Sequence, residues 1–332
     1  MKNRRRLLIV LGATAFALRA VFAQAKQAPV LIGWLHGDSR KSSGHYLAAF
    51  TEALAALGWK EGSQFAIEER WADGQYSRLQ SLAEELAAHK PAVIVAAPLS
   101  SVPAASKAAP KTPIVIASGG DPVASGLVKS LARPGGMITG VTSFTADIAE
   151  KYLELLLAAA PNVKRVGVLD DSASRIATSS QNNPQKEAIL RSVAQYRVEA
   201  RFAAAANPDE IEPAIARLAK DGAQGLIVIV SAMLRNERQR IVKLALAQRW
   251  PIVAGVPEFA EAGALLSYGV VVLANYRRAA YYVDRILKGA KPADLPIERP
   301  TKFELVINMK TAKSLGIKIP NSILVQATKV IE

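Results

Sequence analysis

The sequence predicts an α/β fold made of two doubly wound parallel-sheet lobes, and three observations lead to it. First, short runs of aliphatic and β-branched residues alternate with longer segments whose apolar residues recur at helical spacing. Second, the short runs are apolar on both faces, which is typical of parallel strands covered by helices on each side. Third, the alternation forms two consecutive series of five strands, separated only by residues 143–147. Two similar lobes are therefore expected.

The first series begins with residues 29–35 (PVLIGWL), a short apolar run that predicts a buried strand. Residues 46–57 place their apolar side chains along one helical face, and Gly58 ends that helix. Pro91 stops a second amphipathic segment, because proline cannot continue a helix. Residues 65–71 alternate and so predict a second strand. Further strands are predicted over 92–97, 113–117 and 138–142, and helices over 76–89 and 100–109.

The second series repeats this order of strands and helices. Residues 165–169 (RVGVL) and 225–230 (GLIVIV) predict strands, and Asn207 is a suitable N-cap for the helix that follows it. Helices are predicted over 146–159, 184–196, 209–220, 235–248 and 275–288, and the other strands over 198–203, 251–254 and 264–268. The C-terminal tail adds a strand at 303–307, a helix at 309–315 and a final short strand at 323–325.

Residues 1–23 have the composition of a secretory signal peptide. A basic cluster precedes an apolar run from Leu7 to Leu18, and Val21 and Ala23 provide the small or apolar residues of a cleavage site. The run is shorter than a helix that spans a bilayer. The sequence contains no cysteine, so neither a lipid anchor at the cleavage site nor a disulfide is expected. The sequence therefore predicts a soluble, exported protein of the periplasm.

Charge and motifs argue against several classes of function. The net charge of +14 falls to +9 without residues 1–23, which hold five positive residues and no acid. The remaining positive residues are dispersed, without the basic block and interleaved aromatic residues of a nucleic-acid-binding surface. The three histidines lack metal-site spacing, and the sequence has neither a Walker-type lysine loop nor a Gly-x-Ser-x-Gly elbow. We therefore expect no nucleic-acid partner, no metal or cofactor, and no catalytic activity.

Polar residues follow the predicted strands at the points where the strands end. Ligands of such sheets bind outside the carboxyl ends of the strands, and in a two-lobed protein those ends can face each other across a cleft. Serine hydroxyls and free N–H groups suit a carboxylate, acidic side chains suit an ammonium group, and an aromatic ring can stack on a solute. The candidate ligand-binding residues are Asp38, Ser100, Ser101, Ser118, Gly119, Asp121, Asp171, Ser172, Ser231, Glu258 and Tyr268.

Within this set, the two ends of a zwitterionic solute can be assigned by chemistry. Ser100 and Ser101 open a predicted helix, so we expect them to bind an anionic end. Asp121, Asp171 and Glu258 are candidates for the cationic end. For any single residue, a role as a turn or helix-cap residue explains the same pattern.

Four segments resemble a known family. They are similar to the ABC-transporter substrate-binding proteins, a family that includes tryptophan- and tyrosine-type uptake receptors. The segments are residues 46–62 (YLAAFTEALAALGWKEG), 70–86 (RWADGQYSRLQSLAEEL), 112–143 (TPIVIASGGDPVASGLVKSLARPGGMITGVTS) and 276–320. The resemblance covers essentially all of the chain after residue 23. One departure from the family pattern is the pair Gly119–Gly120, which leaves extra room beside Asp121.

The resemblance implies a type I periplasmic-binding-protein fold, in which a hinge of three crossing segments joins the lobes. By this analogy, the helix predicted over 275–288 returns to the first lobe, and the tail after about residue 300 returns to the second. The implied lobes are residues 28–144 plus 271–300 and residues 145–270 plus 301–332.

The resemblance also implies a function. A solute-binding protein of this type closes on a small polar solute, such as an amino acid or a related carboxylate, and delivers it to an ABC permease. One alternative is a receptor that presents the bound solute to a histidine kinase or a chemoreceptor. A third, an exported hydrolase, has no nucleophile motif to support it. We expect a monomer, and the identity of the solute is not predicted.

Overall fold

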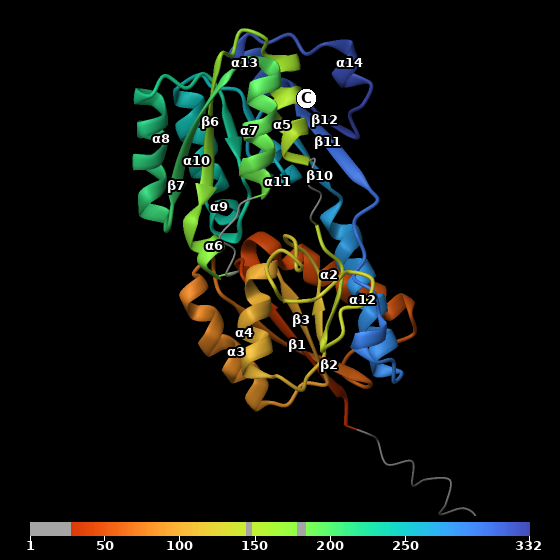
Figure 1. Cartoon of the computed structure of the whole chain (residues 1–332). Helices are drawn as coiled ribbons and strands as arrows, with labels where there is room; N and C mark the ends of the chain where they lie inside the picture. The colour runs from red at the N-terminus through yellow and green to blue at the C-terminus, as the bar shows by residue number, and fades with distance from the viewer. Residues whose placement is uncertain (1–27, 144–147, 178–183) are drawn as a thin grey trace, which may run out of the picture.

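The structure is a computed structural model that describes residues 28–143, 148–177 and 184–332. The predicted signal peptide and the first two residues of the helix predicted over 146–159 lie outside these ranges. The described residues form two α/β lobes, one above the other in Figure 1, each built around its own sheet. Within the described ranges, none of the helices combines the length and the apolar character that a membrane span requires.

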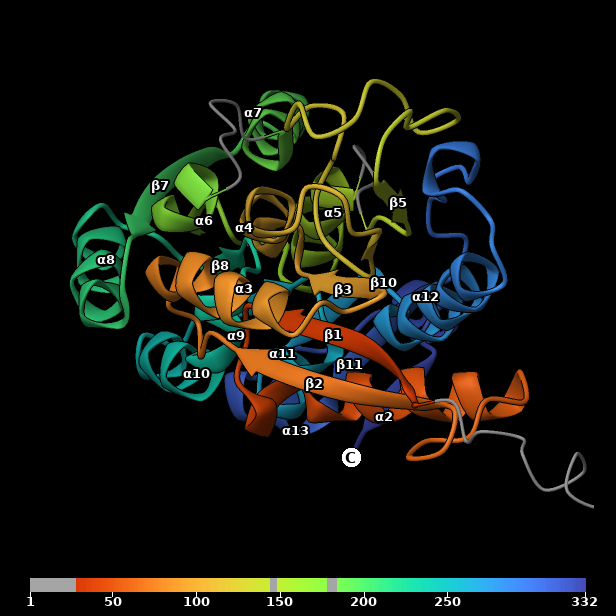
Figure 2. The ribbon, with the colours of Figure 1, turned by 90° about the horizontal axis from the view of Figure 1, so that it is seen from below.

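The first lobe contains a five-stranded, fully parallel sheet. Its strands are β1 (Val30–His36), β2 (Phe65–Trp71), β3 (Val93–Ala97), β4 (Ile114–Ile116) and β5 (Ile138–Gly140), in the order β2-β1-β3-β4-β5. Figure 2 shows this lobe from below, with α2 (Arg40–Ala56) and α12 (Val272–Leu287) on one face and α3 (Leu79–Ala88) and α4 (Val102–Ala108) on the other. The winding direction reverses between β1 and β3, so a crevice opens at their carboxyl ends.

The second lobe contains a seven-stranded sheet. Its strands are β6 (Arg165–Asp171), β7 (Glu199–Ala205), β8 (Leu226–Val228), β9 (Ile252–Ala254), β10 (Leu266–Val270), β11 (Phe303–Asn308) and β12 (Lys329–Ile331), in the order β12-β11-β10-β9-β8-β6-β7. The pairing of β10 with β11 is antiparallel, and the other described pairings are parallel.

Helices cover both faces of the second sheet. On one face lie α5 (Ile148–Ala159), α7 (Pro184–Tyr196), α13 (Met309–Leu315) and α14 (Asn321–Leu324). On the other face lie α8 (Ile211–Lys220), α10 (Arg238–Ala247) and α11 (Pro257–Glu261). The remaining short helices are η1 (Tyr76–Arg78), η2 (Leu99–Ser101), α6 (Ser172–Ala177), η3 (Pro208–Glu210), α9 (Ala232–Asn236) and η4 (Pro292–Asp294).

Several predicted elements need correction, including the helix predicted over 46–57, because α2 begins already at Arg40. The strand predicted over 323–325 is wrong, because α14 occupies that position and the last strand is β12, further along the chain. Hydrogen bonds from the Ile323 and Leu324 amides to the Pro320 carbonyl close a helical turn there, and periodicity cannot distinguish so short an apolar run. The helix predicted over 235–248 is also wrong in its bounds, because α9 ends at Asn236 and α10 begins only at Arg238.

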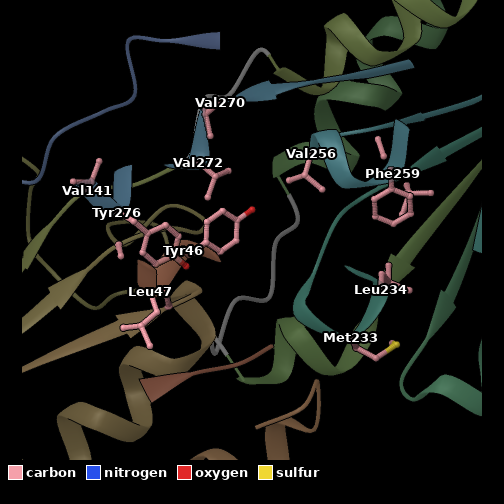
Figure 3. Close-up of a cluster of buried hydrophobic side chains, with 14 of the residues drawn as sticks. Tyr46, Leu47, Val141, Met233, Leu234, Val256, Phe259, Val270, Val272 and Tyr276 are labelled. Carbon is pink, nitrogen blue, oxygen red and sulfur yellow. The ribbon is translucent and has the colours of Figure 1, made fainter. Parts of the chain in front are cut away.

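The chain crosses between the sheets three times. One crossing runs from β5 to α5 and includes residues outside the described ranges, the second joins β10 to α12, and the third leads into β11. The Thr142 amide donates to the Glu298 carbonyl at 3.0 Å, and the Val271 amide donates to the Lys302 carbonyl at 3.0 Å. Figure 3 shows Val270 and Val272 of the second crossing within one apolar cluster that continues from the first lobe into the second.

A buried histidine ends β1. The Asp38 amide donates to His36 Nδ1 at 3.1 Å, so the ring hydrogen lies on Nε2 and donates to the Tyr276 hydroxyl at 2.7 Å. Burial is the main cause that lowers the pKa of His36 to about 4. The folded protein therefore keeps this imidazole neutral at pH values where an unfolded chain would protonate it.

We expect His36 to make the protein less stable in mild acid. The unfolded state takes up a proton below a pH of about 6.5, whereas the folded state does so only near 4, so stability is lost as the pH falls between these values. Over this pH range His36 lowers the free energy of unfolding by about 3 kcal/mol in total. Urea unfolding at pH 7 and pH 4.5 tests this, with His36→Asn as the variant that does not titrate. Equal losses in the two proteins would contradict the assignment.

Candidate functional site

A cavity of about 240 Å³ lies between the two lobes. The loops that follow β3 and β4 line it from the first lobe, and the loops that follow β6, β8 and β9 line it from the second. These are the carboxyl ends of parallel strands, where open α/β sheets bind their ligands. Six of the predicted site residues line the cavity, namely Ser100, Ser118, Gly119, Asp121, Asp171 and Ser231.

The first lobe contributes two serine hydroxyls to the cavity wall. Ser100 is 4% exposed, and its Oγ has no hydrogen-bond partner among the described residues. Ser118 Oγ lies 3.3 Å from the Tyr276 hydroxyl, which already accepts the Nε2 hydrogen of His36. Either hydroxyl can be the donor of this bond, and Ser118 Oγ also lines the cavity, where it can bind a polar group of a solute.

Gly119 brings two loops of the first lobe together. Its φ is +119°, in the region that favours glycine, and an added Cβ would lie 2.3 Å from the Leu99 amide nitrogen. This close approach places the loop after β4 against η2, where Ser100 lies. A side chain at position 119 would therefore separate the loops that carry Ser100 and Ser118.

Asp171 is an extensively hydrogen-bonded acid of the second-lobe wall. Its Oδ2 accepts from the Ser231 hydroxyl at 2.6 Å and from the Tyr76 hydroxyl of the first lobe at 3.0 Å. Its Oδ1 accepts from the Ser174 amide at 3.0 Å. Burial raises the pKa of the Asp171 carboxyl above its usual range, although the bonds from Ser231, Ser174 and Tyr76 oppose the shift.

Asp121 lies at the cavity wall but also holds its own turn. One carboxylate oxygen, Oδ1, accepts from the amides of Val123 at 2.8 Å and Ala124 at 3.1 Å. Asp121 therefore stabilises a turn, as the sequence pattern also allowed, and it lines the cavity as well. Its second oxygen, Oδ2, takes no part in these two bonds.

Five predicted residues do not line the cavity. Asp38 and Glu258 are buried in contacts between the lobes. Ser101 donates to the Ala97 carbonyl at 3.0 Å, and its side chain makes no capping bond at the start of α4. Ser172 begins α6, directly after Asp171, and Tyr268 stacks on Phe303 across the pairing of β10 with β11.

Besides the bond from Tyr76 to Asp171, further pairs of side chains connect the lobes beside the cavity. Tyr46 of α2 donates to Glu258 Oε1 at 2.5 Å, and Ser42 donates to the Asn236 side-chain oxygen at 2.6 Å. Arg235 Nη1 donates to Asp38 Oδ2 at 3.2 Å. Burial alone would raise the pKa of Glu258, but the bond from His45, the charge of Arg235 and the bond from Tyr46 lower it to about 2.

Arg235 lines the cavity but is not among the predicted site residues. Ser231 Oγ accepts from the Leu234 amide at 3.2 Å and so caps α9, and Arg235 follows one helical turn after Ser231. The helix predicted over 235–248 places this arginine at its first position, and so gives no reason to group Arg235 with Ser231. The spacing of four residues was the available signal, since it places two helical residues on one face.

The rest of the wall is largely apolar. Tyr152 is buried at one side of the cavity, and a Cβ at Gly255 would lie 2.5 Å from its hydroxyl oxygen, so the glycine makes room for the ring. The aliphatic side chains of the wall come mainly from the second lobe and the crossings, and include Leu99, Ile148, Ile229, Val256, Val270 and Val272. The cavity therefore offers one polar region and one region suited to an apolar group.

The wall carries more negative than positive groups. Among the described residues that line the cavity, the acids are Asp121, Asp170 and Asp171, and Arg235 is the only lysine or arginine. The charge of Arg235 is already matched by Asp38, which lies outside the lining. Such a wall favours a solute that carries a positive group.

The chain is similar to a known family model and to a protein of known ligand. The family model described as ABC transporter substrate binding protein matches residues 34–331. The "Tyrosine-binding protein" of Clostridioides difficile (strain R20291) is 27% identical over 276 residues, which are 81% of this chain and 76% of that protein.

Two solved structures are similar to the chain over nearly their whole length. The ABC domain from Streptococcus pneumonia in complex with L-Trp has a TM-score of 0.81 at 26% identity, covering 92% of this chain and 100% of that one. The ligand-free, open structure of a substrate binding protein with adhesive properties from Clostridium difficile has a TM-score of 0.65 at 24% identity, covering 91% and 99%.

Proposed function

Because the chain belongs to the family of ABC transporter substrate binding proteins, we propose that it binds an amino acid in the cavity between its lobes and delivers it to a permease. The observation that carries the proposal is the composition of the wall. Serine hydroxyls of the first lobe and carboxylates of the second surround one cavity, so a zwitterion can bind with a charge at each end. The tyrosine-binding relative and the L-Trp complex support an amino acid as the solute.

We propose roles for six residues of the wall. Ser100, Ser118 and the Gly119 loop bind the carboxylate, and Asp171, positioned by Ser231, binds the ammonium group. Asp121 adds negative charge at the same wall. The excess of acidic residues favours an amino acid over a carboxylate that lacks an amine. The aliphatic wall and Tyr152 favour a solute with an apolar side chain.

Closure of the lobes is the proposed mechanism. A solute that contacts both lobes stabilises the arrangement in which they touch, and each tenfold preference for that arrangement is worth about 1.4 kcal/mol. The proposed lobes are residues 28–144 plus 271–300 and residues 145–270 plus 301–332. The packing of α12 on α2 and the pairing of β11 with β10 support this division.

We also propose where and how the protein acts. The composition of residues 1–23 supports export to the periplasm, with removal of that segment. There the protein acts as a soluble monomer that presents its occupied form to the permease and catalyses no reaction. The match to solute-binding proteins supports this role.

A thermal-shift screen of the twenty protein amino acids tests the proposal. An amino acid at about 100 times its Kd should add about 2.7 kcal/mol to the free energy of unfolding. The 2-oxo acid with the same side chain is the matched control, and it should give a smaller shift because it lacks the ammonium group. No shift with any amino acid, together with no small molecule in native mass spectra of the purified protein, would contradict the proposal.

A further inference from the structure

The proposed zwitterion site assigns no role to Arg235. It lines the cavity from α9, and its side chain is only 12% exposed. Its recorded hydrogen bonds go through Nη1, to Asp38 at 3.2 Å and to the Tyr46 hydroxyl at 3.5 Å. Its buried Nε has no hydrogen-bond partner among the described residues. A buried N–H group without a partner is costly, so a partner for it is expected from the solute.

The chemistry of the surrounding donors identifies that partner. A guanidinium group only donates hydrogen bonds, and its planar fork suits a carboxylate. Ser100 Oγ, on the opposite side of the same cavity, is also buried without a partner. The Ser118 hydroxyl lies at the same wall, 3.3 Å from the Tyr276 hydroxyl. Arg235 and Ser100 thus line one cavity from the two lobes, and each has a buried group without a hydrogen-bond partner among the described residues.

We propose that Arg235 binds the carboxylate of the solute together with Ser100 and Ser118, and that Asp38 positions Arg235 from the opposite lobe. The proposal rests on the proposed function and adds a specificity-determining residue to it. Arg235 belongs to the second lobe and Asp38 to the first, so the guanidinium is held in place only when the lobes touch. Recognition of the carboxylate and closure of the lobes are then one event.

Asp38 is suited to the positioning role. It is 1% exposed, and its Oδ2 accepts from the Ser43 hydroxyl as well as from Arg235. The bond from Ser43, within the first lobe, fixes the carboxylate before the second lobe arrives. Asp38 does not line the cavity, so it acts on the solute through Arg235 and not by direct contact.

Paired probes separate recognition of the carboxylate from recognition of the amine. The probes are the twenty protein amino acids and, for each that binds, the amine that lacks its carboxylate, such as tyramine for L-tyrosine. Calorimetric titration gives the affinity ratio of each pair for wild type, Arg235→Gln, Arg235→Lys and Asp38→Asn. Arg240→Gln is the matched control, because Arg240 forms an exposed ion pair with Glu212 within the second lobe. Circular dichroism confirms that each variant is folded.

The expected result is a selective loss. Arg235→Gln should weaken amino-acid binding by roughly 10- to 100-fold, as expected for a charged hydrogen bond, and leave amine binding unchanged or tighter. Arg235→Lys should recover part of the lost affinity. Asp38→Asn should lower the ratio of amino-acid affinity to amine affinity, although the arginine is still present. Arg240→Gln should behave as wild type.

Three outcomes would overturn the account at different points. If the ratio of amino-acid affinity to amine affinity in Arg235→Gln equals that of wild type, Arg235 does not bind the carboxylate. This holds whether both affinities stay the same or both fall equally. If Asp38→Asn keeps the wild-type ratio, Asp38 does not position Arg235. If no amino acid binds to wild type, the proposed function fails, and the inference about Arg235 fails with it.

Discussion

Replacing Asp171 by alanine is expected to reduce amino-acid affinity by about 100-fold or more. The change removes the proposed partner of the ammonium group, and a hydrogen bond between charged groups is worth about 1.5–3 kcal/mol. It also leaves the Ser231 and Tyr76 hydroxyls without their shared acceptor, Asp171 Oδ2. Because Tyr76 belongs to the first lobe, the variant loses a contact between the lobes as well.

Calorimetric titration with the amino acid that gives the largest thermal shift measures this loss. Asp221→Ala is the control, since Asp221 is an exposed acid of the same lobe at the end of α8. Both variants lose one negative charge, so a general charge effect would appear equally in both. An Asp171→Ala protein that binds within threefold of wild type would show that the ammonium group lies elsewhere.

The second large effect is expected for Gly119→Ala. The new Cβ would lie 2.3 Å from the Leu99 amide nitrogen and 2.7 Å from the Leu99 Cβ, and the φ of +119° is unfavourable for alanine. Backbone strain and overpacking together should lower the free energy of unfolding by about 2–5 kcal/mol. Separation of the two loops should also weaken solute binding, since they carry Ser100 and Ser118.

Gly120→Ala is a closely matched control for this prediction. Its added Cβ would meet only Leu99 Cδ2, at 3.6 Å, which is an ordinary contact. We expect a change below about 1 kcal/mol for it in chemical denaturation. Similar stabilities for the two variants would mean that the loops at Gly119 and Leu99 are not held as closely as the structure indicates.

Most of the fold follows from local patterns in the sequence. Strands β1, β3 and β4 of the first sheet are apolar runs that helices cover on both faces, and such runs are visible without knowing the partners. The tail is harder to predict, because Ile323 and Leu324 are apolar in either a strand or a helix. Only the hydrogen bonds back to Pro320 decide between the two.

The site could be predicted in part, because the rule that ligands bind at strand ends requires only the strands. That rule leads to Ser100, Ser118 and Asp171. It cannot say which polar residues face the cavity and which face the other lobe. Asp38 and Glu258 follow strands as the rule requires, but their partners are Arg235 and Tyr46 across the lobes, and such pairs depend on tertiary packing.

The most direct test is a crystal structure of the natively purified protein grown with its best-binding amino acid. The account predicts that the amino acid lies between the sheets, with its carboxylate within hydrogen-bond distance of Ser100 and its ammonium group against Asp171. An amino acid found outside this cavity, or one held by a single lobe while the strand ends of the two sheets face apart, would contradict it.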